Sequence, residues 1–169
     1  MNSNLYSKDM YNYDIPEKSL WELTQCGNDL ESSTMIGDHK FEVAVIGGGY
    51  TGLSAAYHLA RDYGIEVAVI EAGHIGWGAS GRNGGFCSMG GTAESSKNLI
   101  SKYGLEDVRQ YYKSQEEAVE LVKNIIKDEQ IDIQIQGNAE INVAHSKNNL
   151  TEMIEYASFQ RDSLGLNAT

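Results

Sequence analysis

The amino-acid sequence predicts an α/β fold that opens on a strand, a helix and a second strand. Residues 41–46, FEVAVI, form an apolar run of β-forming residues, and residues 65–71, IEVAVIE, form another. The segment 51–64 between them ends at a helix-stopping glycine and shares one helical face among Leu53, Ala56, Leu59 and Ala60. A strand, a helix and a strand within about thirty residues constitute a βαβ unit, whose strands are parallel.

A run of glycines joins the first predicted strand to the helix. The junction reads Gly47, Gly48, Gly49, Tyr50, Thr51 and Gly52, which contains the spacing Gly-x-Gly-x-x-Gly. In a dinucleotide-binding fold the first glycine permits a tight turn, the second leaves room for a pyrophosphate, and the third lets helix and strand approach. Bare N–H groups of the first helical turn then face the phosphates. The spacing predicts a dinucleotide site, with a purely structural turn as the alternative.

An acidic residue at the end of the second strand meets the next requirement of such a site. Glu71 follows the glycines by about twenty residues, where a carboxylate accepts hydrogen bonds from a ribose. A carboxylate there disfavours a 2′-phosphate, so NADP is the least expected ligand. The order of strand, glycines, helix, strand and acid predicts a Rossmann-like unit that binds FAD or NAD.

Composition and charge exclude several classes of protein. The net charge of −11 is spread along the chain, which argues against nucleic acid and anionic membrane surfaces as partners. No stretch approaches the roughly eighteen apolar residues of a membrane span, and the N-terminus lacks the features of a signal peptide. Cys26 and Cys87 are too few for a disulfide framework, and the four histidines are scattered singly. We therefore expect a cytoplasmic protein without a metal site.

The segment that follows Glu71 favours FAD over NAD. Residues 72–92, AGHIGWGASGRNGGFCSMGGT, are so rich in glycine that no regular element is expected. A loop of this length is either disordered or held by a ligand. An NAD dehydrogenase usually passes from the second strand through a short connection into a helix. A second glycine-rich stretch instead indicates that the backbone follows a longer cofactor.

The remainder of the chain predicts two helices and a hairpin. Residues 105–130 place apolar side chains along one stripe of a long amphipathic helix. Isoleucines and Val143 alternate with polar residues over 131–144 around Gly137-Asn138, which is typical of a β-hairpin. Residues 149–164 return to helical spacing, and Gly165 is a plausible left-handed cap that lets the next leucine fold back.

Two stretches resemble a known family. VAVIGGGYTGLSAAYHLA (43–60) and VIEAGHIGWGASGRNGGF (69–86) are similar to the FAD-dependent oxidoreductases of the D-amino-acid oxidase type, in the branch that includes gamma-glutamylputrescine oxidoreductase. Trp21, ahead of the first strand, adds to the resemblance. Specific motifs cover residues 1–90, and the rest matches only by general pattern.

The resemblance implies a set of FAD-binding residues. The first glycines would surround the pyrophosphate, Glu71 would hold the adenosine ribose, and the segment 79–80 would contact the pyrophosphate again. The segment 82–85 would pass close to the flavin ring, although Arg82 could instead be a solvated loop cation. The implied set is Gly47, Gly48, Gly49, Tyr50, Thr51, Gly52, Glu71, Ala72, Gly78, Ala79, Ser80, Arg82, Asn83, Gly84 and Gly85. Trp77 is expected to pack against protein, and Cys87 to be a small buried thiol rather than a flavin attachment point.

The resemblance also implies a reaction and a domain plan. The reaction removes hydride from the carbon beside a primary or secondary amine of a small-molecule substrate, and no residue is identified as catalytic. The plan comprises a Rossmann-like FAD-binding portion (41–130) and the incomplete start of an α+β substrate domain (131–169). Residues 1–40 are polar and turn-prone, so their composition predicts an N-terminal extension, anchored by Trp21 and Leu23.

Two strands are fewer than a doubly wound sheet needs, so we expect an N-terminal fragment of an amine or amino-acid oxidase or dehydrogenase, inactive alone. An NAD-dependent oxidoreductase and a non-catalytic dinucleotide-binding module remain as alternatives. The sequence assigns no oligomeric state.

Overall fold

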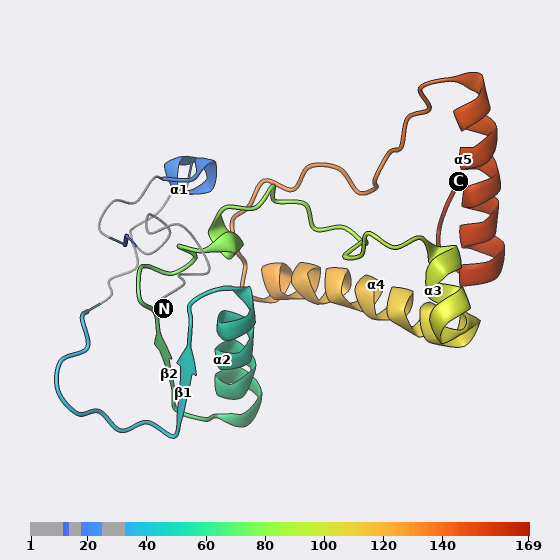
Figure 1. Cartoon of the computed structure of the whole chain (residues 1–169). Coiled ribbons are helices and arrows are strands. Elements are labelled where there is room, and N and C mark those ends of the chain that lie inside the picture. The colour runs from blue at the N-terminus through green and yellow to red at the C-terminus, as the bar shows by residue number, and fades with distance from the viewer. Residues whose placement is uncertain (1–11, 14–17, 25–32) are drawn as a thin grey trace, which may run out of the picture. The chain divides into compact units, whose positions relative to one another are not determined.

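A computed structural model describes residues 12–13, 18–24 and 33–169 of the chain. The chain divides into two compact units, a first unit that ends at Gly85 and a second unit that begins at Phe86. Figure 1 shows the elements in chain order. The helix predicted over 105–130 and the predicted hairpin (131–144) lie in the second unit, whereas the two strands of the predicted βαβ unit and most of the glycine-rich residues lie in the first. The domain boundaries expected from sequence stay a prediction.

The first unit contains the predicted strand, helix and strand. β1 (Val43–Ile46) and β2 (Val67–Ile70) pair in parallel, with Val43 opposite Val67 and Ile46 opposite Ile70. α2 (Tyr50–Tyr63) connects them and packs against both strands (Figure 1). The sequence prediction of an α/β chain with a small parallel sheet is confirmed at this point.

Helix α2 ends at a glycine, as the sequence predicts. Gly64 has a φ of +65°, in the left-handed region that glycine adopts without a steric penalty. The Gly64 N–H donates to the Ala60 carbonyl oxygen and the following Ile65 N–H donates to that of Leu59, so two carbonyls that would otherwise be unpaired at the helix end have partners. This cap turns the chain back toward β2.

Two further parts of the first unit flank the sheet. After β2 the chain runs through the glycine-rich segment with one 3-10 turn at Ala79–Gly81 and no other helix or strand up to Ser95, as expected. Ahead of β1, the described part of the N-terminal segment contains the short helix α1 (Leu20–Thr24), which periodicity did not reveal. The side chain of Leu23 is 67% exposed, so the prediction that it anchors this segment is wrong.

The second unit is helical. α3 (Ser96–Tyr103) is followed directly by α4 (Leu105–Asp128), and α5 (Lys147–Phe159) continues into a π-helical turn at Gln160–Leu164. The long helix and the C-terminal helix were predicted, whereas α3 was not. Its start was nevertheless marked in the sequence, because the Ser95 hydroxyl accepts a hydrogen bond from the Asn98 N–H as an N-cap.

The interior of the second unit is small and mostly apolar. Val108 and Tyr112 of α4 are buried together with Leu164 and Leu166 from the end of the chain. Gly165 has a φ of +74°, which reverses the backbone and lets the Leu166 N–H donate to the Gln160 carbonyl. The predicted cap is confirmed, and it places Leu166 in the interior.

The hairpin predicted over residues 131–144 is wrong. These residues contain no strand, and they run as an irregular segment between α4 and α5 (Figure 1). The apolar side chains that alternate there face solvent, with Ile141 84% and Val143 75% exposed. An isolated two-stranded hairpin is marginal in water unless a further strand or a helix covers its apolar face. Alternation alone therefore did not produce a ladder.

Among the described residues, no helix is both long enough and apolar enough to cross a membrane.

Candidate cofactor-binding site

The junction between β1 and α2 requires glycine at two positions. Gly47 has a φ of +103°, and its N–H donates to the carbonyl oxygen of Ile70 at 2.8 Å, which joins the turn to the end of β2. A Cβ at Gly52 would overlap the carbonyl oxygen of Gly47. The first glycine therefore permits the turn, and the last lets α2 begin directly against it.

In the described part of the chain, the first turn of α2 contains one backbone N–H group that a side chain accepts and two that have no acceptor. The Tyr50 N–H, which the sequence predicted to be bare, donates to Ser80 Oγ at 2.9 Å. Within the described part of the chain, the N–H groups of Thr51 and Gly52 have no hydrogen-bond acceptor. A Cβ at Gly49 would lie 2.9 Å from Ser80 Oγ, so this glycine keeps open the space between the helix start and the hydroxyl. A partly open cradle of N–H groups lies at the positive end of the helix dipole.

The carboxylate of Glu71 closes one side of this cradle. Its Oε2 accepts the Gly48 N–H at 2.6 Å, and its Oε1 accepts the Gly73 N–H at 3.0 Å. The Gly73 and Gly48 amides, in that order of effect, lower the pKa of Glu71, while partial burial opposes them. The carboxylate is therefore ionised near neutral pH and held in one orientation against the first glycine-rich stretch.

The second glycine-rich stretch lies against the first. The Gly76 N–H donates to the Gly48 carbonyl oxygen at 3.0 Å, and Ser80 bonds the Tyr50 N–H as described above. A Cβ at Gly81 would overlap the carbonyl oxygen of Gly76, so the loop folds tightly on itself between these contacts. Two segments far apart in sequence thus meet at the N-terminus of α2.

Asn83 holds the end of this loop in shape. Its side-chain amide donates to the carbonyl oxygens of Ser80 at 2.8 Å and Ala79 at 3.2 Å. Its Oδ1 accepts the Gly85 N–H at 2.8 Å, and its amide also reaches the Tyr50 hydroxyl at 3.5 Å. One side chain therefore pairs backbone groups of the loop that would otherwise need water.

Arg82 and Trp77 pack on each other rather than into the cradle. Arg82 Nε donates to the Trp77 carbonyl oxygen at 2.6 Å, and the guanidinium lies 5.2 Å from the indole centroid. The Trp77 ring also lies 4.8 Å from the Tyr13 ring. The prediction that Trp77 packs against protein is confirmed, whereas the prediction that Cys87 is buried is wrong, because its thiol is exposed.

The predicted residues fall into two neighbouring groups, except Gly85, which lies against the Trp21 ring. The cradle group comes from three places: the first glycine-rich stretch, the residues that follow β2, and the 3-10 turn of the second glycine-rich stretch. Its members are Gly47, Gly48, Gly49, Tyr50, Thr51, Gly52, Glu71, Ala72, Gly78, Ala79 and Ser80. A second group borders an open pocket of about 450 Å³ together with the N-terminal segment. This pocket is lined by Ser19, Leu20, Trp21, Arg82, Asn83 and Gly84.

Sequence reasoning missed several of these contributors. Gly73 and Gly76 belong to the same site through their N–H groups, but no motif spacing distinguishes them from the other loop glycines. Ser19 and Glu22 stand at the spacing of a capping box, which could have revealed α1.

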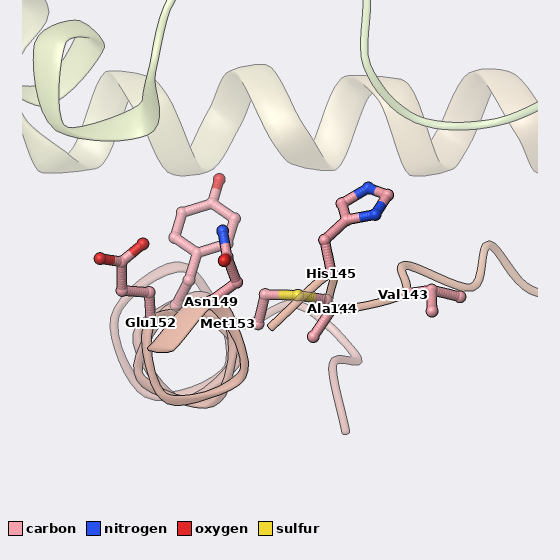
Figure 2. Close-up of a pocket in the computed structure, with 7 residues that line it drawn as sticks. Val143, Ala144, His145, Asn149, Glu152 and Met153 are labelled. Atoms are coloured by element: carbon pink, nitrogen blue, oxygen red, sulfur yellow. The ribbon is translucent and has the colours of Figure 1, made fainter. Parts of the chain in front are cut away.

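A second hollow lies in the second unit and contains none of the predicted residues. Figure 2 shows Asn149, Glu152 and Met153 on α5 and Val143, Ala144 and His145 on the segment that leads into this helix, all of which line the hollow. The hollow has a volume of about 290 Å³ and is widely open. Among the described residues no hydrogen bond or ion pair joins His145 to Glu152. It offers no convergent set of chemical groups comparable to the cradle.

Over the described ranges, no group of three or more His, Cys, Asp or Glu side chains is arranged to hold a metal ion.

The chain is similar in sequence to several oxidoreductases. It is 45% identical over 92 residues to the gamma-glutamylputrescine oxidoreductase of Escherichia coli (strain K12), which covers 54% of this chain and 21% of that protein. It is 34% identical over 137 residues to the probable oxidoreductase OrdL of Rhizobium meliloti (strain 1021), covering 80% of this chain and 28% of that protein. A sarcosine oxidase subunit beta of Rhizobium meliloti is 50% identical over 44 residues, which are 25% of this chain.

The chain thus spans less than a third of the length of these curated relatives. No solved structure matches it significantly. The sequence model of one family, described as DAO, FAD dependent oxidoreductase, matches residues 42–168. This match includes both glycine-rich stretches and extends through α5, so the chain belongs to the FAD-dependent oxidoreductase family.

Proposed function

We propose that this chain forms the FAD-binding portion of an oxidoreductase that acts on the C–N bond of a primary or secondary amine or amino acid. The single observation that carries the proposal is the meeting of two glycine-rich stretches and one carboxylate at the start of α2. Family membership supports a flavin as the dinucleotide. FAD, when bound, supplies the hydride acceptor, and the protein supplies binding, orientation and exclusion of water.

The donors at the start of α2 fit a diphosphate. The N–H groups of Thr51 and Gly52 are unused among the described residues, and they lie at the positive end of the helix dipole. Ser80 accepts the Tyr50 N–H with its oxygen, and within the described ranges its own O–H has no acceptor, so it can donate to a phosphate oxygen. The contact between Ser80 and the helix therefore adds a donor to the cradle, although it removes one backbone N–H from it.

The position of Glu71 fits a ribose. An ionised carboxylate has about four lone-pair sites, and two backbone N–H groups occupy one site on each oxygen. The remaining sites can accept the two hydroxyls of an adenosine ribose. Because the Gly48 N–H fixes the carboxylate beside the glycines, the sugar and the diphosphate would be held at adjacent positions.

The segment 82–85 would border the flavin ring in this arrangement. Arg82, Asn83 and Gly84 line the pocket of about 450 Å³ that α1 also borders. The names of the relatives point to amines such as gamma-glutamylputrescine or sarcosine as the class of substrate. Because the chain covers about a fifth of the first of these proteins, we propose that it holds FAD but oxidises no amine by itself.

The binding proposal is tested by adding FAD to the purified chain and recording flavin fluorescence and visible absorbance. We expect saturable quenching and a perturbed flavin spectrum with the unaltered chain. Gly49→Val should abolish both, because its side chain would fill the space between the α2 N-terminus and Ser80. Ala55→Val adds bulk at an exposed position of the same helix and should bind FAD normally.

Far-UV circular dichroism of both variants checks that α2 is retained. Equal FAD affinity of Gly49→Val and the unaltered chain would refute the cradle. Rapid amine-dependent bleaching of FAD bound to the chain would refute the proposal that it is inactive alone. Tight NADH binding with no affinity for FAD would replace the flavin by a nicotinamide cofactor.

A further inference from the structure

The short helix α1 begins with a self-contained capping arrangement. The Glu22 N–H donates to Ser19 Oγ at 3.2 Å, and the Ser19 N–H donates back to Glu22 Oε2 at 2.6 Å. This reciprocal pair satisfies N–H groups that a helix start leaves unpaired. A helix of five residues is too short to persist by itself in water, so its position depends on contacts with the rest of the unit.

One set of contacts attaches α1 to the end of the second glycine-rich stretch. The Trp21 indole N–H donates to the Asn83 carbonyl oxygen at 2.8 Å. A Cβ at Gly85 would lie 2.7 Å from the Trp21 ring, and Gly85 has a φ of +75°. The indole therefore packs directly on the backbone of Gly85, and the side chain of any other residue there would collide with the ring. Trp21 remains 46% exposed, so the contact uses about half of its surface.

A second contact attaches α1 to the start of the same stretch. His74 Nε2 donates to Glu22 Oε1 at 2.6 Å, while the other oxygen of Glu22 takes part in the capping pair. The pKa of Glu22 is lowered, mainly by the Ser19 N–H and further by His74, so the carboxylate is ionised near neutral pH. Figure 1 shows α1 beside the loop that follows β2.

The two attachment points bracket the part of the loop that reaches α2. Ser80, which bonds the Tyr50 N–H, lies between His74 at one end and Asn83 at the other. A stretch so rich in glycine has a large conformational entropy when it is free. Fixing both ends before a ligand arrives lowers the entropy that must be lost on binding, and so raises affinity.

We propose that Ser19–Glu22 is an N-terminal clasp that holds the second glycine-rich stretch in its FAD-binding conformation, with Trp21 as a positioning residue for the segment 82–85. This inference rests on the proposed FAD site. The clasp makes the region ahead of the βαβ unit part of the cofactor site, although it contributes nothing to the glycine motifs. It also forms one wall of the pocket that Arg82, Asn83 and Gly84 line.

The test compares Trp21→Ala with Leu23→Ala, a substitution on the same helix at an exposed side chain outside the pocket. Amide hydrogen exchange over residues 74–85 is measured without FAD, and the FAD dissociation constant is measured by fluorescence. Trp21→Ala should speed exchange of the Gly85 and Gly76 N–H groups and raise the dissociation constant by about tenfold, the value of one hydrogen bond with its packing. Leu23→Ala should change neither.

Trp21→Phe separates the two contacts of the indole. It keeps an aromatic ring against Gly85 and loses the N–H donor to Asn83, so we expect partial rescue of both exchange rate and affinity. Exchange in the later turns of α2, beyond the Tyr50 N–H that Ser80 accepts, monitors the fold and should be the same in all variants. Unchanged exchange over 74–85 in Trp21→Ala would overturn the clasp, as would faster exchange accompanied by unchanged FAD affinity.

Failure of the proposed function has a different signature. If the unaltered chain does not bind FAD, the proposed function fails while the exchange data still decide whether α1 orders the loop. In that case equal exchange rates in Trp21→Ala and Leu23→Ala would overturn the clasp as well, and faster exchange in Trp21→Ala alone would support its hold on the loop.

Discussion

At the scale of single residues, Glu71 connects the two glycine-rich stretches of the first unit through its carboxylate. Its two oxygens accept N–H groups from both glycine-rich stretches, so one side chain joins the β1–α2 turn to the loop after β2. Hydrogen bonds from backbone amides to an ionised carboxylate are stronger than those between neutral groups. The same charge that would attract a ribose thus also stabilises the protein.

The lowered pKa of Glu71 gives stability a defined pH dependence. Because the folded-state pKa lies below the ordinary value of 4.5, the ionised side chain stabilises the fold above that pH, and its contribution is lost as the pH falls through the folded value. Glu71→Gln should lower the free energy of unfolding by about 1–3 kcal/mol at neutral pH, since its NH₂ group would face one of the two backbone donors.

Urea denaturation at a series of pH values measures this effect. The difference between the unaltered chain and Glu71→Gln should shrink as the pH falls from neutral to below 4.5. Glu66→Gln, at an exposed carboxylate immediately before β2, is the matched control and should have little effect. A difference that stays constant over this range would show that the charge of Glu71 does not stabilise the fold.

At the scale of elements, α2 is capped at its two ends by different means. Gly64 caps the C-terminus from within the chain segment that follows the helix. The N-terminus has no side-chain cap of its own, and Ser80, from the distant loop, accepts the Tyr50 N–H instead. The start of α2 and the loop are therefore coupled, because the Ser80 hydroxyl pairs the Tyr50 N–H and the same bond fixes the Ser80 side chain.

Ser80→Ala tests this coupling. Removal of the hydroxyl should cost about 1 kcal/mol of stability, as for a lost N-cap, and should speed hydrogen exchange of the Tyr50 N–H. It should also weaken FAD binding, because a donor to the diphosphate disappears. The same substitution at Ser54, exposed on α2, should leave both properties unchanged, and equal behaviour of the two variants would contradict the coupling.

At the scale of the whole molecule, the chain consists of two compact units whose interiors differ. The first unit is organised around a two-stranded sheet and one helix. The second has an interior in which Ser96 is 1% exposed and its Oγ lies 2.7 Å from the Tyr112 hydroxyl and 2.9 Å from that of Tyr156. Such a buried network stabilises a fold only while every member is paired.

Ser96→Ala should therefore destabilise the second unit and leave the cofactor site intact. Removal of the Ser96 hydroxyl leaves the buried Tyr112 hydroxyl without its hydrogen-bond partner, which should lower the free energy of unfolding by about 1–3 kcal/mol. Ser101→Ala on the exposed face of α3 is the matched control. Hydrogen exchange resolved by residue should speed within α3, α4 and α5, the three helices that the network joins, and the FAD dissociation constant should be unchanged. A parallel loss of FAD affinity would show that the two units act as one.

The sequence by itself determined the elements whose signals are local. β1, α2, β2, α4, α5 and the glycine caps follow from spacing that spans only a few residues, so each pattern specifies its element without knowledge of the rest. The first glycines and Glu71 were also found from spacing, because glycines at a strand–helix junction have few other physical uses, whereas the loop residues of the cradle, such as Ser80, were implied only by the resemblance to a family.

Tertiary structure alone decided the remaining features. The alternation over 131–144 is a strand pattern, yet no strand forms there, since pairing depends on what covers the apolar side chains. The bond from Trp21 to Asn83 joins positions 62 residues apart, and the N-cap of α2 comes from a loop 30 residues away. No periodicity encodes such pairs, because they depend on where the folded backbone brings distant groups within hydrogen-bonding distance.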